Sequence, residues 1–225
     1  MTAPKTARAR ARAELTKEIK DEARRQLAEV GANGLSLRAV ARELGMVSSA
    51  LYRYFPSRDH LLTELIVDAY NAIGEAAEQA DNQPGIAPRA RWSRIWHATR
   101  AWAKDHPHEY ALIYGSPIPG YQAPQDTIAP AGRVARALIN AMRLEDLRTP
   151  RQEILDPRLR EQVETVAEEL GVDIYAQTML RLLTAWTQLF GTISFELFGQ
   201  YVGSVDPSDL YFDYVTERMA DYVGL

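Results

Sequence analysis

A run of polar and aromatic side chains between Gly45 and Pro56 has the residue types needed to contact DNA. Serine hydroxyls and tyrosine tips can bond to phosphate oxygens, and an outward arginine can fork onto a guanine in the major groove. Two further arginines flank the run. The predicted DNA-binding residues are therefore Arg38, Ser48, Ser49, Tyr52, Arg53, Tyr54 and Arg58. In the alternative interpretation, the tyrosines only pack against the core.

Two short helices joined by a glycine turn would position these side chains. The first would be capped by Ser36 and would bury Leu37, Val40, Ala41 and Leu44. Gly45 would end it, and the second helix would stop near Phe55 because proline cannot continue a helix. This is the helix-turn-helix plan, in which the second helix lies in the major groove. A longer helix over about 8–30, ended by Gly31, precedes the pair.

The formal charge is unevenly distributed along the chain. Residues 1–60 hold 12 Lys and Arg against 7 Asp and Glu, which gives +5, so the remainder of this chain of net charge −4 carries −9. A basic end on an acidic protein suggests that this end meets a polyanion. The basic residues Lys5, Arg8, Arg10 and Arg12 either reach the minor groove or the DNA backbone, or form a solvated tail.

Residues 34–45 (GLSLRAVARELG) and 50–62 (ALYRYFPSRDHLL) resemble the DNA-binding domain of TetR-family transcriptional regulators. The resemblance covers about residues 12–65, and residues 114–124 are similar to a C-terminal domain class of that family. It implies an all-helical homodimer that binds a palindromic DNA operator through domain 1–57. It also implies that domain 58–225 binds a small-molecule effector and dimerises. The seven residues named above occupy the positions that touch DNA in the family.

One departure from the family pattern lies in the turn. The sequence has Val47 where the family often has Ser or Thr, so we expect the cap of the following helix to move to Ser48. Tyr54 replaces a frequent histidine and keeps an aromatic ring with a hydrogen-bonding tip.

Beyond the first domain the chain also reads as all-α. Ser57 caps a long fourth helix, and proline, glycine and apolar spacing then predict helices over about 88–105, 109–114, 133–144, 174–198 and 207–222. The proline- and glycine-rich segment 115–132 reads as an ordered loop or a lid, and 150–157 as a polar connection. We expect the last two long helices to form the dimer by four-helix packing.

Aromatic side chains are frequent in the second domain, and an apolar helical domain with a few polar tips can hold a small molecule. The residues predicted to line such a pocket are Trp96, Tyr114 and Trp186, with His97 and Thr99 as polar partners. The alternative is that these rings are ordinary core.

Several classes of function find no support. The chain has no cysteine, and it lacks phosphate-binding glycine loops, nucleophile elbows and paired-histidine zinc motifs, so we expect neither an enzyme nor a cofactor. His106 and His108 read as a solvated turn and not as a metal site. No signal peptide or membrane span is expected, which favours a cytoplasmic protein at the bacterial nucleoid. A repressor, an activator, a regulator without effector and a helical protein-binding adaptor remain open.

Overall fold

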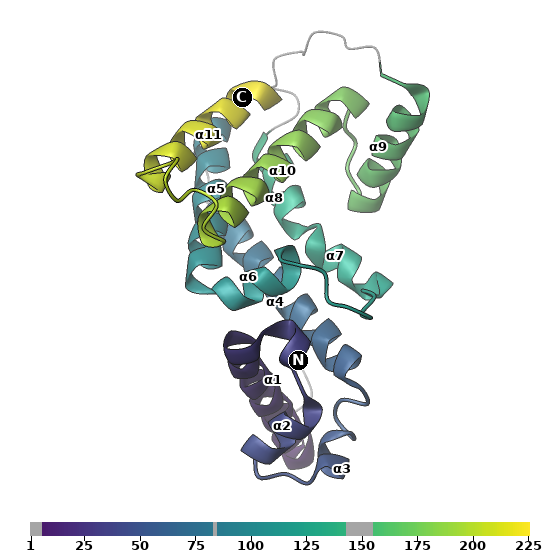
Figure 1. Cartoon of the computed structure of the whole chain (residues 1–225). Helices are drawn as coiled ribbons and strands as arrows, with labels where there is room; N and C mark the ends of the chain where they lie inside the picture. The colour runs from purple at the N-terminus through teal and green to yellow at the C-terminus, as the bar shows by residue number, and fades with distance from the viewer. Residues whose placement is uncertain (1–5, 83–84, 143–154) are drawn as a thin grey trace. The chain divides into compact units, whose positions relative to one another are not determined.

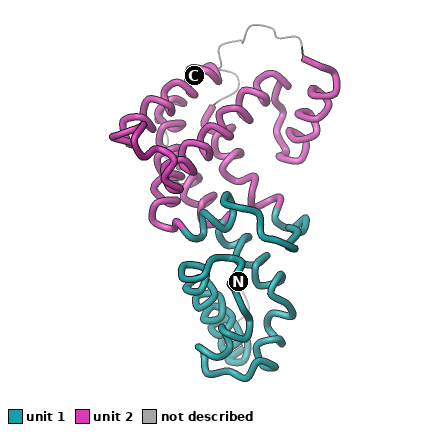
Figure 2. The backbone as a smooth tube through the Cα atoms, viewed as in Figure 1, with its two compact units in different colours: residues 1–69, 108–127 teal, residues 70–107, 128–225 magenta. Residues whose placement is uncertain are grey.

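The structure is a computed structural model that describes residues 6–82, 85–142 and 155–225. All regular elements in these ranges are helices, which confirms the all-α prediction. The chain forms two compact units: unit 1 contains residues 1–69 and 108–127, and unit 2 contains residues 70–107 and 128–225 (Figure 2). No helix in the described ranges is long and apolar enough to cross a membrane.

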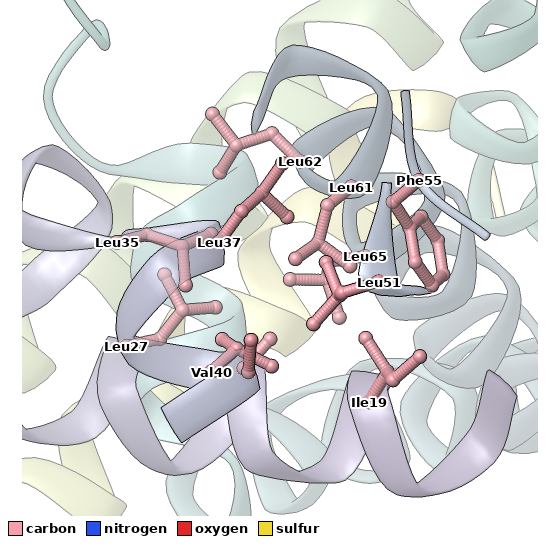
Figure 3. Packing of buried hydrophobic residues seen from close by; sticks show 12 residues of the cluster. Ile19, Leu27, Leu35, Leu37, Val40, Leu51, Phe55, Leu61, Leu62 and Leu65 are labelled. Carbon is pink, nitrogen blue, oxygen red and sulfur yellow. The ribbon is translucent and has the colours of Figure 1, made fainter. Parts of the chain in front are cut away.

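Unit 1 begins with α1 (Ala7–Gly34), α2 (Leu37–Glu43), α3 (Ser48–Leu51) and the first half of α4 (Arg58–Asp81) (Figure 1). Apolar side chains from all four helices meet in one core (Figure 3). Ile19, Val40, Leu51, Leu61 and Leu62 are fully buried in it. The spacing of these residues therefore fixes how α2 and α3 pack against α1 and α4.

The expected end of the first helix at Gly31 is a break inside α1. Gly31 does adopt a left-handed φ of 68°, but helical geometry resumes after this kink and continues to Gly34. The first helical run therefore ends at this glycine as expected, because glycine tolerates that φ without strain, and a second short run follows it to Gly34. The predicted cap of α2 is confirmed, since Ser36 Oγ accepts a hydrogen bond from the Ala39 amide at 3.5 Å.

The expected cap of α3 is wrong. Val47 is the N-cap residue, it provides no side-chain hydrogen bond, and Ser48 is already the first helical residue. The reason is geometric: Val47 has the extended backbone of a cap, with φ −70° and ψ 137°. The turn is held instead by its backbone, where the Met46 amide donates to the Ala41 carbonyl at 2.8 Å.

A later segment of the chain completes unit 1. It contains most of α6 (Pro107–Tyr114) and the 3₁₀ turn η1 (Gln125–Thr127). Glu109 Oε1 accepts a hydrogen bond from Arg24 Nε at 3.0 Å, and the Tyr121 and Thr63 hydroxyls are 2.9 Å apart. Leu112, Ile118 and Tyr121 pack against the core. Segment 108–127 is thus an ordered part of unit 1.

Unit 2 contains α5 (Pro88–Asp105), α7 (Ile128–Ala131), α8 (Arg133–Met142), α9 (Pro157–Leu170), α10 (Ala176–Leu197) and α11 (Ser208–Val223). Helix α5 packs against α8, α10 and α11, and α10 and α11 also contact each other (Figure 1). Trp92, Trp96 and Phe212 are fully buried between them. Sequence reasoning missed α9, and most of the predicted connection 150–157 lies outside the described residues.

A half-buried ion pair links three helices of unit 2. Arg100 on α5 donates two hydrogen bonds to Glu196 on α10, at 2.7 and 2.6 Å, and Ser208 at the start of α11 donates a third at 3.0 Å. Burial raises the pKa of Glu196, but the bonds from Arg100 and Ser208 outweigh it and leave this pKa below its ordinary value. The carboxylate is therefore the form that joins α5, α10 and α11.

Candidate nucleic-acid interface

The helix-turn-helix of unit 1 is packed on one side and open on the other. Leu37, Val40 and Leu51 point into the core, as Figure 3 shows. The Gly45 φ of 66° allows the tight turn between α2 and α3. Because α3 is a single turn buried only through Leu51, its remaining side chains are available to a partner.

Most of the predicted DNA-binding residues lie on this open side. Ser49, Tyr52 and Arg53 are exposed, and so is Arg38 on α2, whereas Ser48 is half-buried. Within the described ranges, neither Arg38 nor Arg53 has a carboxylate within 4.0 Å, although the neighbouring Arg42 has Glu43 at 3.5 Å. Two unpaired guanidiniums beside hydroxyls and an exposed tyrosine are the groups that bind phosphates and guanine edges.

Tyr54 has a second role in addition to the predicted contact. Its ring is half-buried and packs against the core of unit 1, and the Arg12 guanidinium lies 5.3 Å from the ring centroid. The ring therefore connects the start of α1 to the segment after α3. Sequence reasoning placed both residues near DNA but had no signal for this contact, because 42 positions separate them.

Arg58 differs from the other predicted residues because its guanidinium is bound within the protein. Nη2 donates to the Ala32 carbonyl at 2.7 Å and Nε to the Leu35 carbonyl at 3.2 Å. These carbonyls belong to the end of α1 and the residue that follows it, where helical hydrogen bonds run out. The side chain is 30% exposed, so Arg58 contributes first to the structure of unit 1.

Two of the predicted pocket residues carry buried donors without acceptors. The indole Nε1 atoms of Trp96 on α5 and Trp186 on α10 are buried and have no hydrogen-bond partner in the described structure. Trp92, one turn before Trp96, donates its indole hydrogen to the Thr216 carbonyl at 3.3 Å. Buried polar groups are normally paired, so unpaired ones require an explanation such as a ligand or a water molecule.

The other three predicted pocket residues are placed differently. His97 is exposed, with Nε2 3.3 Å from Asp213 Oδ1, and the Thr99 hydroxyl donates to the Ile95 carbonyl at 2.8 Å. Tyr114 belongs to unit 1. A polar pocket of about 590 Å³ in unit 2 is lined by none of the five predicted residues; its walls include Glu75, Glu78, Asp81, Arg91, Arg133 and Asn140. The described residues contain no cluster of three or more potential metal ligands.

Comparison with known proteins identifies the family. Residues 19–65 match the family model described as bacterial regulatory proteins, tetR family, and residues 92–219 match a tetracyclin repressor-like C-terminal domain. The fold and the open helix-turn-helix define a DNA-binding transcriptional regulator. The chain belongs to the TetR family, as the resemblance of residues 12–65 indicated.

Individual relatives agree with this assignment. The HTH-type transcriptional regulator Mb1846 of Mycobacterium bovis is 40% identical over 200 residues, which cover 85% of this chain and 84% of that protein. The crystal structure of regulatory protein SCO4313 has 34% identity and a TM-score of 0.79 over 96% of this chain and 100% of its own. The regulator PfmR of Thermus thermophilus, at 18% identity, has a TM-score of 0.54 over 88% of this chain and 97% of its own, and shares the fold.

Proposed function

We propose that this regulator is a repressor that binds a palindromic operator as a homodimer and that a small-molecule effector releases it. The observation that carries the proposal is the exposed, unpaired set of Arg38, Ser49, Tyr52 and Arg53 on the helix-turn-helix. These residues, with Ser48 and Tyr54, make the base and phosphate contacts in the proposal. Residues 1–57 act as the DNA-binding domain, and 58–225 bind the effector and dimerise.

The dimer part of the proposal rests on exposed apolar side chains of two neighbouring helices. Phe195 on α10 is 51% exposed, and Leu210 and Tyr214 on α11 are 62% and 61% exposed. Large apolar groups left exposed on a pair of contacting helices favour burial against a partner. A second copy of the same pair would form a four-helix interface with two-fold symmetry, which matches a palindromic operator.

The effector part rests on the unpaired indole donors of Trp96 and Trp186. A ligand that accepts hydrogen bonds from them inside unit 2 would bind more tightly to the conformer that presents both donors. An effector can shift the protein only by its difference in affinity between two conformers, typically about 1–3 kcal/mol. The recognition helices of the two subunits must lie about 34 Å apart to enter successive major grooves. A coupling energy of that size is sufficient to release DNA if the second conformer changes this separation.

Iterative selection of random duplex DNA by the purified protein tests the proposal, with affinity measured at two salt concentrations. A repressor of this type enriches a palindrome, and its affinity falls steeply as salt rises. Enrichment of a single half-site would contradict the dimeric operator. The absence of any enriched motif would favour a regulator that needs its effector to bind DNA, or a protein-binding adaptor.

A further inference from the structure

The first turns of α1 carry three arginines that have no partner of opposite charge. Arg8, Arg10 and Arg12 are exposed, and no carboxylate lies within 4.0 Å of them among the described residues. The basic residues further along α1 are each paired with a carboxylate; they are Lys17, Lys20, Arg24 and Arg25. The bases of α1 from Lys17 onward are therefore paired with acids, whereas the positive charge of its first turns is not.

Arg12 is the arginine of this group whose position is fixed by a contact. Its guanidinium lies 5.3 Å from the ring centroid of Tyr54, and that ring is itself held by packing on the core. A guanidinium stacked on an aromatic face keeps its N–H groups free at the edge of its plane. Those N–H groups therefore lie beside the segment that follows α3, and no residue in the described ranges accepts a hydrogen bond from them.

We propose that Arg12, held on the Tyr54 ring, binds a phosphate of the DNA backbone beside the recognition helix. Arg8 lies one helical turn earlier on the same side of α1 and extends this site to a neighbouring phosphate. A guanidinium binds a phosphate through paired, charge-assisted hydrogen bonds. The inference rests on the proposed function, and it makes the start of α1 a fixed backbone clamp in place of a minor-groove arm or a solvated tail.

The test compares Arg12→Ala with Lys17→Ala on two duplexes of equal length, the selected operator and a random sequence. Both substitutions remove one positive charge from an exposed position of α1, but Lys17 is already paired with Asp21 at 2.6 Å. Arg12→Ala should weaken binding to both duplexes about tenfold at low salt. It should also reduce the slope of log K against log salt by about 0.9, the value for one phosphate contact. Lys17→Ala should change neither quantity.

A pair of Tyr54 variants tests whether the ring positions Arg12. Tyr54→Phe keeps the ring but removes the proposed hydroxyl contact, so the affinity should fall while the salt slope, which counts neutralised phosphates, equals that of the wild type. Tyr54→Leu removes the ring and should lower the slope as Arg12→Ala does, and combining the two substitutions should lower it no further. If thermal unfolding shows that Tyr54→Leu is not folded, the Arg12 and Lys17 comparison decides alone.

Two results would overturn the inference, and they differ in what else they affect. Equal salt slopes for Arg12→Ala and Lys17→Ala would contradict the phosphate contact of Arg12 without contradicting the proposed operator binding. A wild-type protein that binds neither duplex would contradict both the phosphate contact and the proposed operator binding.

Discussion

Arg58 Nη2 donates a hydrogen bond of 2.7 Å to the carbonyl oxygen of Ala32, and this bond joins the first turn of α4 to the end of α1. A second bond from the same guanidinium reaches Leu35 at 3.2 Å. The end of α1, which leads into the helix-turn-helix, is thereby anchored by a residue that follows the helix-turn-helix in sequence. Arg58 thus stabilises the position of the helices that flank α2 and α3.

Arg58→Ala should lower the free energy of unfolding by about 1–3 kcal/mol, because two carbonyls lose a charged donor. Urea unfolding measures this change. Arg53→Ala is the matched control, since Arg53 is exposed and unpaired and its loss should change stability by less than about 0.5 kcal/mol. Equal stability of the two variants would contradict the anchoring role.

Arg53→Ala should instead change which DNA sequences are bound. An arginine that forks onto a guanine contributes about 1–3 kcal/mol of discrimination at one base pair. Selection with the variant should therefore return the wild-type motif with one position relaxed in each half-site. A motif that is uniformly weakened, with every base preference retained, would assign Arg53 to the backbone.

The two tryptophans of α5 should respond differently to the same substitution. Trp92→Phe loses the indole hydrogen bond to the Thr216 carbonyl, whereas Trp96→Phe removes a donor that has no acceptor among the residues the structure describes. We expect Trp92→Phe to cost about 1 kcal/mol more in urea unfolding than Trp96→Phe, since the loss of ring size is common to both. A larger loss for Trp96→Phe would show that its indole hydrogen has a partner.

The ion pair of Arg100 and Glu196 should make stability depend on pH. The Glu196 pKa is below its ordinary value of 4.5 in the folded protein, so its contribution is fully present above about pH 4.5 and is lost as the pH falls through the lower folded value. Glu196→Gln should lower the free energy of unfolding by about 1–3 kcal/mol at pH 7, because the half-buried Arg100 loses the carboxylate that accepts two of its hydrogen bonds. The difference between variant and wild type should shrink in urea titrations at about pH 3, below that ordinary value. A difference that is constant with pH would contradict this role.

An aspartate on the exposed α10 and α11 face should separate the proposed dimer. Phe195→Asp and Tyr214→Asp each place a charge where apolar contact is expected, so the variants should sediment as monomers at concentrations at which the wild type is dimeric. Leu159→Asp on α9 is the control, because Leu159 is 42% exposed but lies on another helix. A dimeric Phe195→Asp or Tyr214→Asp would place the interface elsewhere.

Local signals in the sequence were sufficient for most of the helices. Pro88 and Pro107 bracket α5 at the predicted positions, and Ser36 caps α2 as expected, because proline and cap residues act on the backbone next to them. Val47 shows the limit of this reasoning. A strong cap residue stood one position later, yet Val47 has the extended backbone of the cap and Ser48 is already helical.

Contacts between distant residues were not accessible from the sequence. Arginine is a residue type that commonly contacts DNA, so the sequence favoured that role for Arg58. Its hydrogen bonds to Ala32 and Leu35 depend instead on how α4 packs against the end of α1. Helix α9 was missed because its charged residues leave only Val163 and Ala167 as buried positions, a weak periodic signal. The placement of segment 108–127 in unit 1 likewise follows from packing and not from any motif.

That placement has a consequence during synthesis on the ribosome. The core formed by α1 to α4 also receives Leu112, Ile118 and Tyr121, so it is incomplete until about residue 121 has left the exit tunnel. Helix α5 has emerged by then, but α8, α10 and α11, against which its buried tryptophans pack, have not yet been synthesised. The nascent chain therefore cannot complete the core of unit 1 before α5 has been synthesised. A fragment that ends after residue 69 would lack segment 108–127 and expose an apolar surface that promotes aggregation.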